Sequence, residues 1–236
     1  MPAPAGAVAV VIPTFNEVES IGAVVAELPG TVVGRIIVVD GGSSDGTPDA
    51  ARRAGAEVIG VGRGYGVACL TGAKAADSAE IIVFMDGDGA DDPAAIAGLV
   101  APIRAGTCDF VIASRARGER EAGSMAWHQI AAGFFAGWLT KVLYGVRYTD
   151  MCAFRAIRRD TLLMLGMREL TYGWNLEMQM RAARAGLRIL ELPVAYRRRL
   201  GGHSKVAGSL RGSVQAGLKI ISTFARVASE PARRRG

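Results

Sequence analysis

Five short runs of apolar residues, rich in Val and Ile, constrain the fold of this chain more than any other feature. The runs cover residues 8–13, 35–40, 56–61, 80–86 and 109–114, and segments with helical periodicity separate them. Because the apolar residues are continuous rather than alternating, each strand is expected to be covered on both faces. The pattern predicts an α/β fold in which a mostly parallel central sheet lies between layers of helices.

The segments between and after these runs predict the remaining elements. Asn16, with Glu19 three residues later, is typical of a capping box, and Pro29 with Gly30 is typical of a helix end. We expect further helices over residues 48–55, 66–76, 93–104, 124–144 and 175–185, strands over 153–157 and 187–196, and a helix after 206. The chain contains no internal repeat and no linker of biased composition, which favours one continuous domain.

Composition narrows the class of protein. Half of the 236 residues are hydrophobic and 21% are charged, which excludes a disordered or fibrous chain. The three cysteines fit neither a disulfide framework nor a zinc site, and they favour a reducing cytosol. The sequence MPAPAG is unlike a signal peptide, and no stretch of 18 uncharged apolar residues occurs. We therefore expect a cytoplasmic protein that does not span a membrane.

The charge differs between the two parts of the chain. Residues 1–100 carry 5 Lys/Arg against 13 Asp/Glu, whereas residues 101–236 carry 23 against 9. An acidic region suits a metal ion or a nucleotide bound through a metal. A basic region suits phosphates, an anionic membrane surface or nucleic acid.

Two loops that follow predicted strands carry candidate ligand-binding residues. Asp86 and Asp88 flank a glycine directly after 80–85, where an open parallel sheet binds its ligands, and two such carboxylates suit a divalent ion. Alternatively, they form an acidic turn before the helix at Pro93. The segment 40–47, DGGSSDGT, allows close approach of a ligand to the backbone, with Asp40 as an acceptor; alternatively, it is a loop that ends in the helix cap Thr47.

Six segments, taken in order, resemble one enzyme family. They are VVIPTFNE (10–17), VVDGGSSDGT (38–47), MDGDG (85–89), ASR (113–115), WNLEM (174–178) and RLGGHSK (199–205). Together they resemble the family 2 glycosyltransferases, most closely the dolichol-phosphate mannose synthase type. The resemblance implies a GT-A fold, a nucleoside diphosphate sugar donor, Mg²⁺ or Mn²⁺, and transfer of the sugar with inversion. It covers residues 8–206, so we predict a glycosyltransferase domain over 1–206 and a basic amphipathic helix and tail over 207–236.

The resemblance also implies roles for individual residues. Asp86 and Asp88 would lie at the diphosphate, with Asp88 as the principal metal ligand. The residues implied to line the nucleotide pocket are Pro13, Thr14, Asn16, Glu17 and Asp40, and those implied to meet phosphates are Arg115, Arg199, Ser204 and Lys205. Two departures from the family pattern affect this site: Gly41 replaces an Asp beside Asp40, and Ala90 stands where the family often has Gln.

The resemblance leaves the acceptor open between a hydroxyl and a phosphate. A hydroxyl acceptor needs a general base, for which Glu177 is the candidate by its position in the family pattern. A phosphate monoester, with a second pKa near 6, already presents anionic oxygens and needs no base. In that case Glu177 would position rather than deprotonate. The first choice is a polyprenyl or dolichyl phosphate acceptor.

Two segments bear on membrane contact. Residues 124–144 contain Trp127, Phe134, Phe135 and Trp138, and they form either a core helix or an interfacial one. Residues 187–236 hold 11 Lys/Arg against 2 Asp/Glu, and their helical stripe predicts adhesion of a basic amphipathic helix to an anionic membrane surface. The expected location is the cytoplasm, either free in the cytosol or peripheral on the cytoplasmic face of a membrane.

Two other functions are compatible with parts of the sequence. A nucleotidyltransferase would use a related sheet, but PTFNE stands where its glycine-rich basic loop is expected. A basic module for nucleic acid would use the positive charge, which lies mainly in the tail without interleaved exposed aromatic residues. We therefore expect no nucleic-acid partner.

Overall fold

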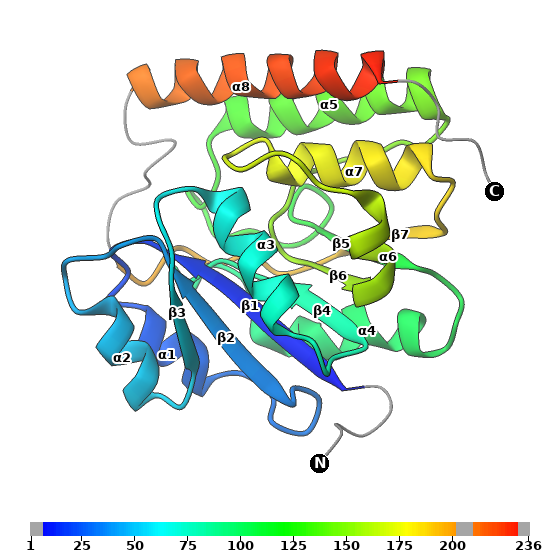
Figure 1. Ribbon diagram of the computed structural model, residues 1–236. Helices are drawn as coiled ribbons and strands as arrows, with labels where there is room; N and C mark the ends of the chain where they lie inside the picture. The colour runs from blue at the N-terminus through cyan, green and yellow to red at the C-terminus, as the bar shows by residue number, and fades with distance from the viewer. Residues whose placement is uncertain (1–6, 202–209, 231–236) are drawn as a thin grey trace.

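A seven-stranded sheet organises the computed structural model, which describes residues 7–201 and 210–230 (Figure 1). The strand order is β3-β2-β1-β4-β6-β5-β7, and neighbours are parallel except where β6 pairs with β4 and β5. The strands are β1 Val8–Thr14, β2 Arg35–Asp40, β3 Glu57–Gly60, β4 Ile81–Phe84, β5 Phe110–Ser114, β6 Arg155–Arg158 and β7 Ile189–Pro193. The predicted α/β fold with a mostly parallel sheet is confirmed.

Helices cover the sheet and extend beyond it. They are α1 Ile21–Ala26, α2 Thr47–Arg53, α3 Tyr65–Ala75, the 3₁₀ turn η1 Pro93–Ala95, α4 Ile96–Arg104, α5 Trp127–Tyr144, α6 Arg159–Leu165, α7 Trp174–Arg184 and α8 Leu210–Ser229. Helix α3 packs against β1 and β2, and α4 packs against β4, β5 and β6. Helix α6 was not predicted, because its seven residues follow β6 without any turn signal.

The predicted capping box at Asn16 is wrong. Helix α1 begins at Ile21, and the carbonyl of Glu17 accepts the N–H groups of Ser20 and Ile21 in a turn that precedes it. Asn16 instead adopts a left-handed conformation with φ of 52°, and its side chain accepts the N–H of Ser44 at 3.1 Å. The short polar side chain therefore joins two loops rather than capping a helix.

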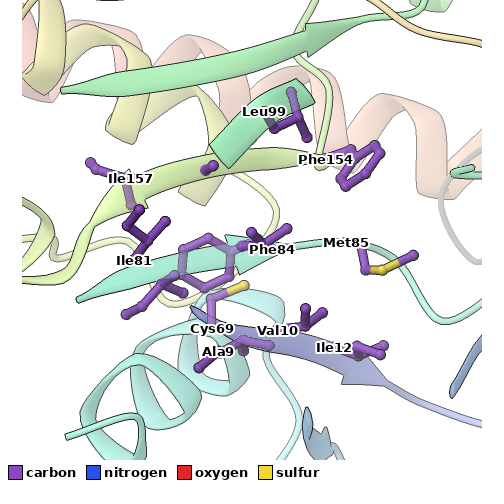
Figure 2. Close-up of a cluster of buried hydrophobic side chains, with 14 of the residues drawn as sticks. Ala9, Val10, Ile12, Cys69, Ile81, Phe84, Met85, Leu99, Phe154 and Ile157 are labelled. Carbon is purple, nitrogen blue, oxygen red and sulfur yellow. The ribbon is translucent and has the colours of Figure 1, made fainter. Parts of the chain in front are cut away.

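The core lies around the central strands (Figure 2). Ile12 of β1 and all four residues of β4 are buried, as the continuous apolar runs require. The ring of Phe84 meets that of Trp174 edge to face, with centroids 6.3 Å apart. Burial of side chains of this size contributes about 1.5–3 kcal/mol each, so the core holds the carboxyl ends of β1 and β4 at fixed positions.

Helices α5, α7 and α8 lie together at one end of the molecule (Figure 1), where α7 packs against both α5 and α8. They share a small apolar cluster that contains Ala136, Met180 and Val227. The core interpretation of the aromatic residues of α5 is wrong, because Trp127, Phe134, Phe135, Trp138 and Val142 are 41–79% exposed.

Small residues on the inward face of α5 explain this orientation. A Cβ on Gly137 would lie 1.8 Å from the carbonyl oxygen of Tyr148, and Ala136 and Thr140 are buried. The helix therefore packs closely on residues 148–151 through its smallest side chains, which leaves the large ones facing outward. Among the helices of the described ranges, no segment combines the length and hydropathy needed to cross a bilayer.

Candidate functional site

The loops that follow β1, β2 and β4 meet at the carboxyl edge of the sheet. The three strands are parallel and adjacent, and Thr14 pairs in register with Asp40. Ligands of open parallel sheets bind at this edge. The structure therefore brings together the loops that carry most of the predicted site residues.

The loops after β1 and β2 are joined by hydrogen bonds. The N–H of Asn16 donates to Ser43 Oγ at 2.8 Å, and the N–H of Glu17 donates to Thr47 Oγ1 at 2.8 Å. Pro13 precedes them within β1, opposite Val39. Hydroxyl side chains of the second loop thus fix the backbone of the first, which places the predicted nucleotide-pocket residues on one connected surface.

Asp40 organises the loop that follows it. Its carboxylate is almost fully buried and accepts the N–H groups of Gly42 and Ser43 at 3.0 and 2.8 Å. The hydroxyls of Ser43 and Thr14 also donate to it. A carboxylate with four such donors is held rigidly, so Asp40 fixes the conformation of this loop.

Three aspartates gather in the loop after β4. The N–H of Asp86 donates to Asp91 Oδ2 at 3.1 Å, and Asp88 Oδ1 accepts the N–H of Ala90 at 3.0 Å. The hydroxyl of Tyr65, the first residue of α3, donates to Asp86 Oδ1 at 3.4 Å. The hydroxyl of Ser20 donates to the carbonyl of Gly87 at 2.7 Å and ties the loop to the start of α1.

Burial and mutual repulsion shift the titration of these carboxyl groups. Burial, followed by the charge of Asp88, raises the pKa of Asp86 to about 7, although Arg115 and Tyr65 act in the opposite direction. Burial and the charges of Asp86 and Asp88 raise the pKa of Asp91 well above its usual value. The site therefore concentrates negative charge that a cation would stabilise.

These residues fit a divalent ion. Within residues 7–201 and 210–230, no group of three or more His, Cys, Asp or Glu side chains is arranged to hold a metal by itself. Two carboxylates are sufficient for Mg²⁺ or Mn²⁺, however, because such ions take further oxygen ligands from phosphates and water. Asp86 and Asp88 supply those carboxylates, and a bound cation would offset the burial and the mutual repulsion that raise the pKa of Asp86.

Arg115 lies near the aspartates but is bound to Asp150. Its Nε and Nη2 donate to the two oxygens of Asp150 at 2.9 and 2.8 Å, and its N–H also donates to Asp150 at 2.9 Å. The guanidinium stacks over the ring of Tyr196 at 5.0 Å. Arg115 therefore holds a positive charge at a fixed position, and this charge acts to lower the pKa of Asp86 and of Asp91.

Arg199 connects the loops after β1 and β4. Its Nη2 lies 3.3 Å from Glu17 Oε1 and 3.5 Å from Asp88 Oδ2, and the N–H of Leu200 donates to the carbonyl of Asp88 at 2.9 Å. Residues 197–200 therefore run along the aspartate loop. Ser204 and Lys205, predicted from the same motif, lie outside the described residues.

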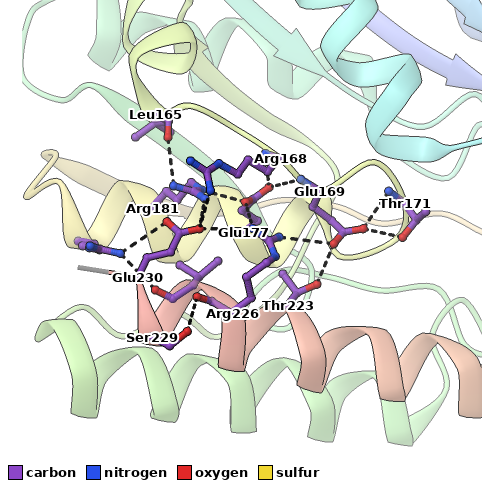
Figure 3. A network of polar contacts seen from close by, with 12 residues as sticks. Leu165, Arg168, Glu169, Thr171, Glu177, Arg181, Thr223, Arg226, Ser229 and Glu230 are labelled. Atoms are coloured by element: carbon purple, nitrogen blue, oxygen red, sulfur yellow. Dashed lines mark hydrogen bonds and ion pairs between the residues drawn. The ribbon is translucent and has the colours of Figure 1, made fainter. Parts of the chain in front are cut away.

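Glu177 lies fully buried in a network between α7 and α8 (Figure 3). Its Oε2 accepts the N–H groups of Arg168 and Glu169 at 2.9 and 2.6 Å, and its Oε1 accepts Arg181 and Arg226 at 2.9 Å each. Burial alone would raise the pKa of Glu177, but these donors outweigh it and lower the pKa. All four acceptor positions of the carboxylate are occupied, so these contacts do not support a role as general base.

Sequence reasoning missed Tyr65, Asp150 and Tyr196. Tyr65 lies in the run GVGRGYG, whose glycines resemble a dinucleotide-binding motif only superficially. The run therefore did not indicate that Tyr65 belongs to the site. Its position in the connection from β3 to α3, at another carboxyl end of the parallel sheet, was the signal that could have found it. Asp150 and Tyr196 lie in no motif that the sequence made recognisable, and only the fold brings them to Arg115.

Comparison with known proteins gives matches along most of the chain. The family model described as glycosyl transferase family 2 matches residues 9–163. An uncharacterized glycosyltransferase of Mycobacterium tuberculosis is 39% identical over 92% of this chain and 98% of its own length. An undecaprenyl-phosphate mannosyltransferase of Micrococcus luteus is 31% identical over 86% of this chain and 88% of its own. A polyprenol monophosphomannose synthase of Mycolicibacterium smegmatis is 29% identical over 85% of this chain and 81% of its own length.

A solved structure shares the fold. Glucosyl-3-phosphoglycerate synthase from Mycobacterium tuberculosis, in complex with Mn²⁺, UDP-glucose and phosphoglyceric acid, superposes with a TM-score of 0.75 at 22% identity. The match covers 96% of this chain and 81% of that one. The GT-A fold expected from the sequence motifs is confirmed.

Proposed function

Because the chain belongs to glycosyltransferase family 2, we propose that it is a metal-dependent, inverting transferase that moves a sugar from a nucleoside diphosphate sugar to a polyprenyl phosphate. The observation that carries this proposal is the position of Asp86 and Asp88 at the carboxyl edge of the sheet, beside Arg199. Relatives named for undecaprenyl-phosphate and polyprenol mannose transfer support the acceptor class.

The nucleotide would occupy the joined loops after β1 and β2. We propose that Pro13, Thr14, Asn16, Glu17 and Asp40 line its pocket, since Asp40 and the hydroxyls around it hold this surface in place. Asp86 and Asp88 would hold Mg²⁺ or Mn²⁺ at the diphosphate. The superposable enzyme that binds Mn²⁺ and UDP-glucose supports this assignment.

The reaction builds negative charge on the departing diphosphate and positive character on the sugar. A bound divalent ion would neutralise part of the charge on the diphosphate. Arg199 can turn from Glu17 and Asp88 toward a phosphate, and Arg115 adds a fixed positive charge nearby. We assign Ser204 and Lys205 to the same phosphates on their place in the motif. Preorganised charges of this kind stabilise the transition state.

The contacts of Glu177 favour a phosphate acceptor over a hydroxyl. A hydroxyl must lose a proton to a base, but the carboxylate of Glu177 is buried and already accepts four hydrogen bonds. A phosphate monoester is anionic at pH 7 and attacks the sugar carbon opposite the diphosphate without that step. We therefore interpret Glu177 as a residue that positions neighbouring parts of the protein, such as the backbone of residues 168–169, rather than one that moves a proton.

A polyprenyl phosphate is held in a membrane, and the exposed face of α5 suits such a surface. Trp127, Phe135, Trp138 and Val142 lie on one side of this helix and are 53–79% exposed. Residues 122–149 contain Lys141 and Arg147 but no acidic residue, and α8 likewise contains none. Aromatic side chains next to basic ones favour the interface of an anionic bilayer. We propose peripheral membrane attachment through α5 together with α8, from the cytoplasmic side.

The test is Asp88→Ala, assayed for transfer from a nucleotide sugar to polyprenyl phosphate with Mn²⁺. We expect loss of transfer, because Asp88 is the proposed principal metal ligand. Asp77→Ala is the matched control, since that side chain is 78% exposed and pairs with Arg35 near the start of β2. Unchanged turnover in Asp88→Ala would contradict the proposed function, and release of pyrophosphate from a nucleoside triphosphate would favour a nucleotidyltransferase.

A further inference from the structure

Buried contacts connect α8 with the candidate donor site through three other segments. We propose that Thr223 and Arg226 are positioning residues for that site: they fix residues 166–173, which fix the start of α3 and thereby Tyr65 against Asp86. The inference rests on the proposed role of Asp86 at the donor diphosphate. It makes a helix outside the sheet part of the donor-binding machinery.

The first step joins α8 to residues 166–173 and α7 (Figure 3). The hydroxyl of Thr223, which is 1% exposed, donates to Glu169 Oε2 at 3.1 Å. Arg226 Nη1 donates to Glu177 Oε1 at 2.9 Å, and its Nη2 lies 3.5 Å from Glu169 Oε2. Both side chains of α8 therefore contact the buried carboxylate of Glu169, and Arg226 also binds that of Glu177.

In the second step, these carboxylates hold the backbone of residues 166–173. Glu177 Oε2 accepts the N–H groups of Arg168 and Glu169 at 2.9 and 2.6 Å. Glu169 Oε1 accepts the N–H of Thr171 at 3.0 Å. The backbone of this segment thus depends on acceptors that side chains of α8 help to orient.

In the third step, the segment supports the N-terminal turn of α3. The N–H of Val67 donates to the carbonyl of Leu170 at 3.1 Å. A Cβ on Gly66 would lie only 2.2 Å from the carbonyl oxygen of Glu169, so the two backbones are in direct contact. A displacement of residues 166–173 is therefore transmitted to the start of α3.

The last step reaches the aspartates. Tyr65 is the first residue of α3, and its hydroxyl donates to Asp86 Oδ1 at 3.4 Å. Because this distance already exceeds the usual O–H···O range of about 2.5–3.0 Å, a small shift of α3 would break the contact. The orientation of Asp86 therefore depends on the docking of α8.

A double-mutant cycle tests this connection. Thr223→Val keeps the packing but removes the donor to Glu169, Thr223→Ser restores the hydroxyl, and Tyr65→Phe removes the donor to Asp86. The measurement is the Kd for UDP, GDP, dTDP or CDP, whichever wild type binds most tightly with Mn²⁺, by calorimetry. Hydrogen exchange at Val67 and Thr171 reports the two intermediate steps. Arg184→Ala is the control, since this side chain donates to the carbonyl of Val227 on α8 and pairs with Glu230, which follows the helix.

We expect Thr223→Val and Arg226→Ala to weaken nucleotide binding by about 5- to 150-fold, the usual range for coupled sites. Exchange should speed up at both Val67 and Thr171, and Thr223→Ser should restore wild-type values. In the Tyr65→Phe background, Thr223→Val should have no further effect on Kd, because it acts through the same hydroxyl.

Two results would overturn the inference. Additive effects of Thr223→Val and Tyr65→Phe on Kd would show that Thr223 does not act through Tyr65. Faster exchange at Thr171 with unchanged Val67 exchange and unchanged Kd would show that α8 only clamps residues 166–173. A wild-type protein that binds none of the nucleotides would instead contradict the proposed function, and this outcome differs from both.

Discussion

Replacing Glu177 with glutamine separates a structural role of this carboxylate from a catalytic one. The substitution keeps the shape of the side chain but removes the negative charge of the carboxylate, which accepts hydrogen bonds from Arg181 and Arg226 at 2.9 Å. It also replaces one acceptor oxygen with an NH₂ group that faces other donors. The contacts of Glu177 predict that this change lowers stability far more than it lowers turnover.

The size of the effect follows from the partners that remain. Neutralising one member of a buried ion pair costs about 3–5 kcal/mol. Arg181 keeps Glu230 at 2.7 Å and Arg226 keeps Glu169 at 3.5 Å, so neither guanidinium loses every partner. We therefore expect a loss near the lower limit, about 3 kcal/mol. For a chain of this size the Tm should fall by about 6–12 °C.

The assay combines calorimetry at pH 7 with transfer kinetics at 20 °C, where both proteins are folded. We expect kcat at saturating donor to change by less than tenfold, whereas loss of a general base lowers it by about 100- to 10,000-fold. Asp160→Asn is the control, because it neutralises a carboxylate whose side chain is 90% exposed. A kcat reduced more than 100-fold with an unchanged Tm would refute this reasoning.

Acid should remove the difference in Tm between wild type and Glu177→Gln. The folded state lowers the pKa of Glu177 from its ordinary value of 4.5, because its hydrogen-bond donors outweigh burial. A lowered pKa contributes stability that is complete above pH 4.5 and is lost as the pH falls through the folded-state pKa. The gap in Tm between wild type and Glu177→Gln should therefore be constant from pH 7 to 5 and shrink below pH 4.5. A gap that widens in acid would contradict the assignment.

Two further predictions concern a close backbone contact and an exposed face. Gly66→Ala should lower the free energy of unfolding by about 1–3 kcal/mol, because the new methyl group clashes with the carbonyl of Glu169. Gly98→Ala, in open space on α4, should raise the free energy of unfolding by about 1 kcal/mol. Equal effects of the two substitutions in urea unfolding would contradict the contact at Gly66. Phe135→Ser combined with Trp138→Ser should weaken co-sedimentation with phosphatidylglycerol vesicles by about tenfold or more. Met164→Ser, which changes another exposed apolar residue, should not; unaltered sedimentation of the double variant would exclude α5 from the membrane interface.

The strands were predictable because each is a continuous apolar run, which in a globular chain is typical of a strand covered on both faces. The order and direction of the strands in the sheet were harder to predict from the sequence. β6 lies between β4 and β5 and runs antiparallel to both, yet nothing in residues 153–157 encodes a direction. The outward face of α5 was missed for a related reason. Periodicity places Trp127 and Trp138 on one face, but only the packing of Gly137 against Tyr148 decides which face turns inward.

For the site, sequence reasoning identified residue types better than partners. Asn16 has the side chain of a helix cap, but its acceptor meets Ser44, 28 residues away, rather than the next turn. Glu177 was placed on the correct helix, but one of its donors, Arg226, lies 49 residues away on α8. Local patterns predict hydrogen bonds within a turn or helix, whereas pairing between loops depends on the strand order, which the sequence does not display.

The opposite charges of the two parts of the chain partly neutralise each other within the fold. Arg158 pairs with Glu80, and Arg197 pairs with Glu27 and Asp92, so basic residues of the second part bind acidic residues of the first. The net charge of each part therefore overstates the charge that an outside ligand meets. Arg199 differs from these pairs because Asp88, one of its partners, is also the proposed metal ligand. A divalent ion at Asp88 would compete with Arg199 for that carboxylate, and we expect the guanidinium to exchange it for a phosphate oxygen of the donor.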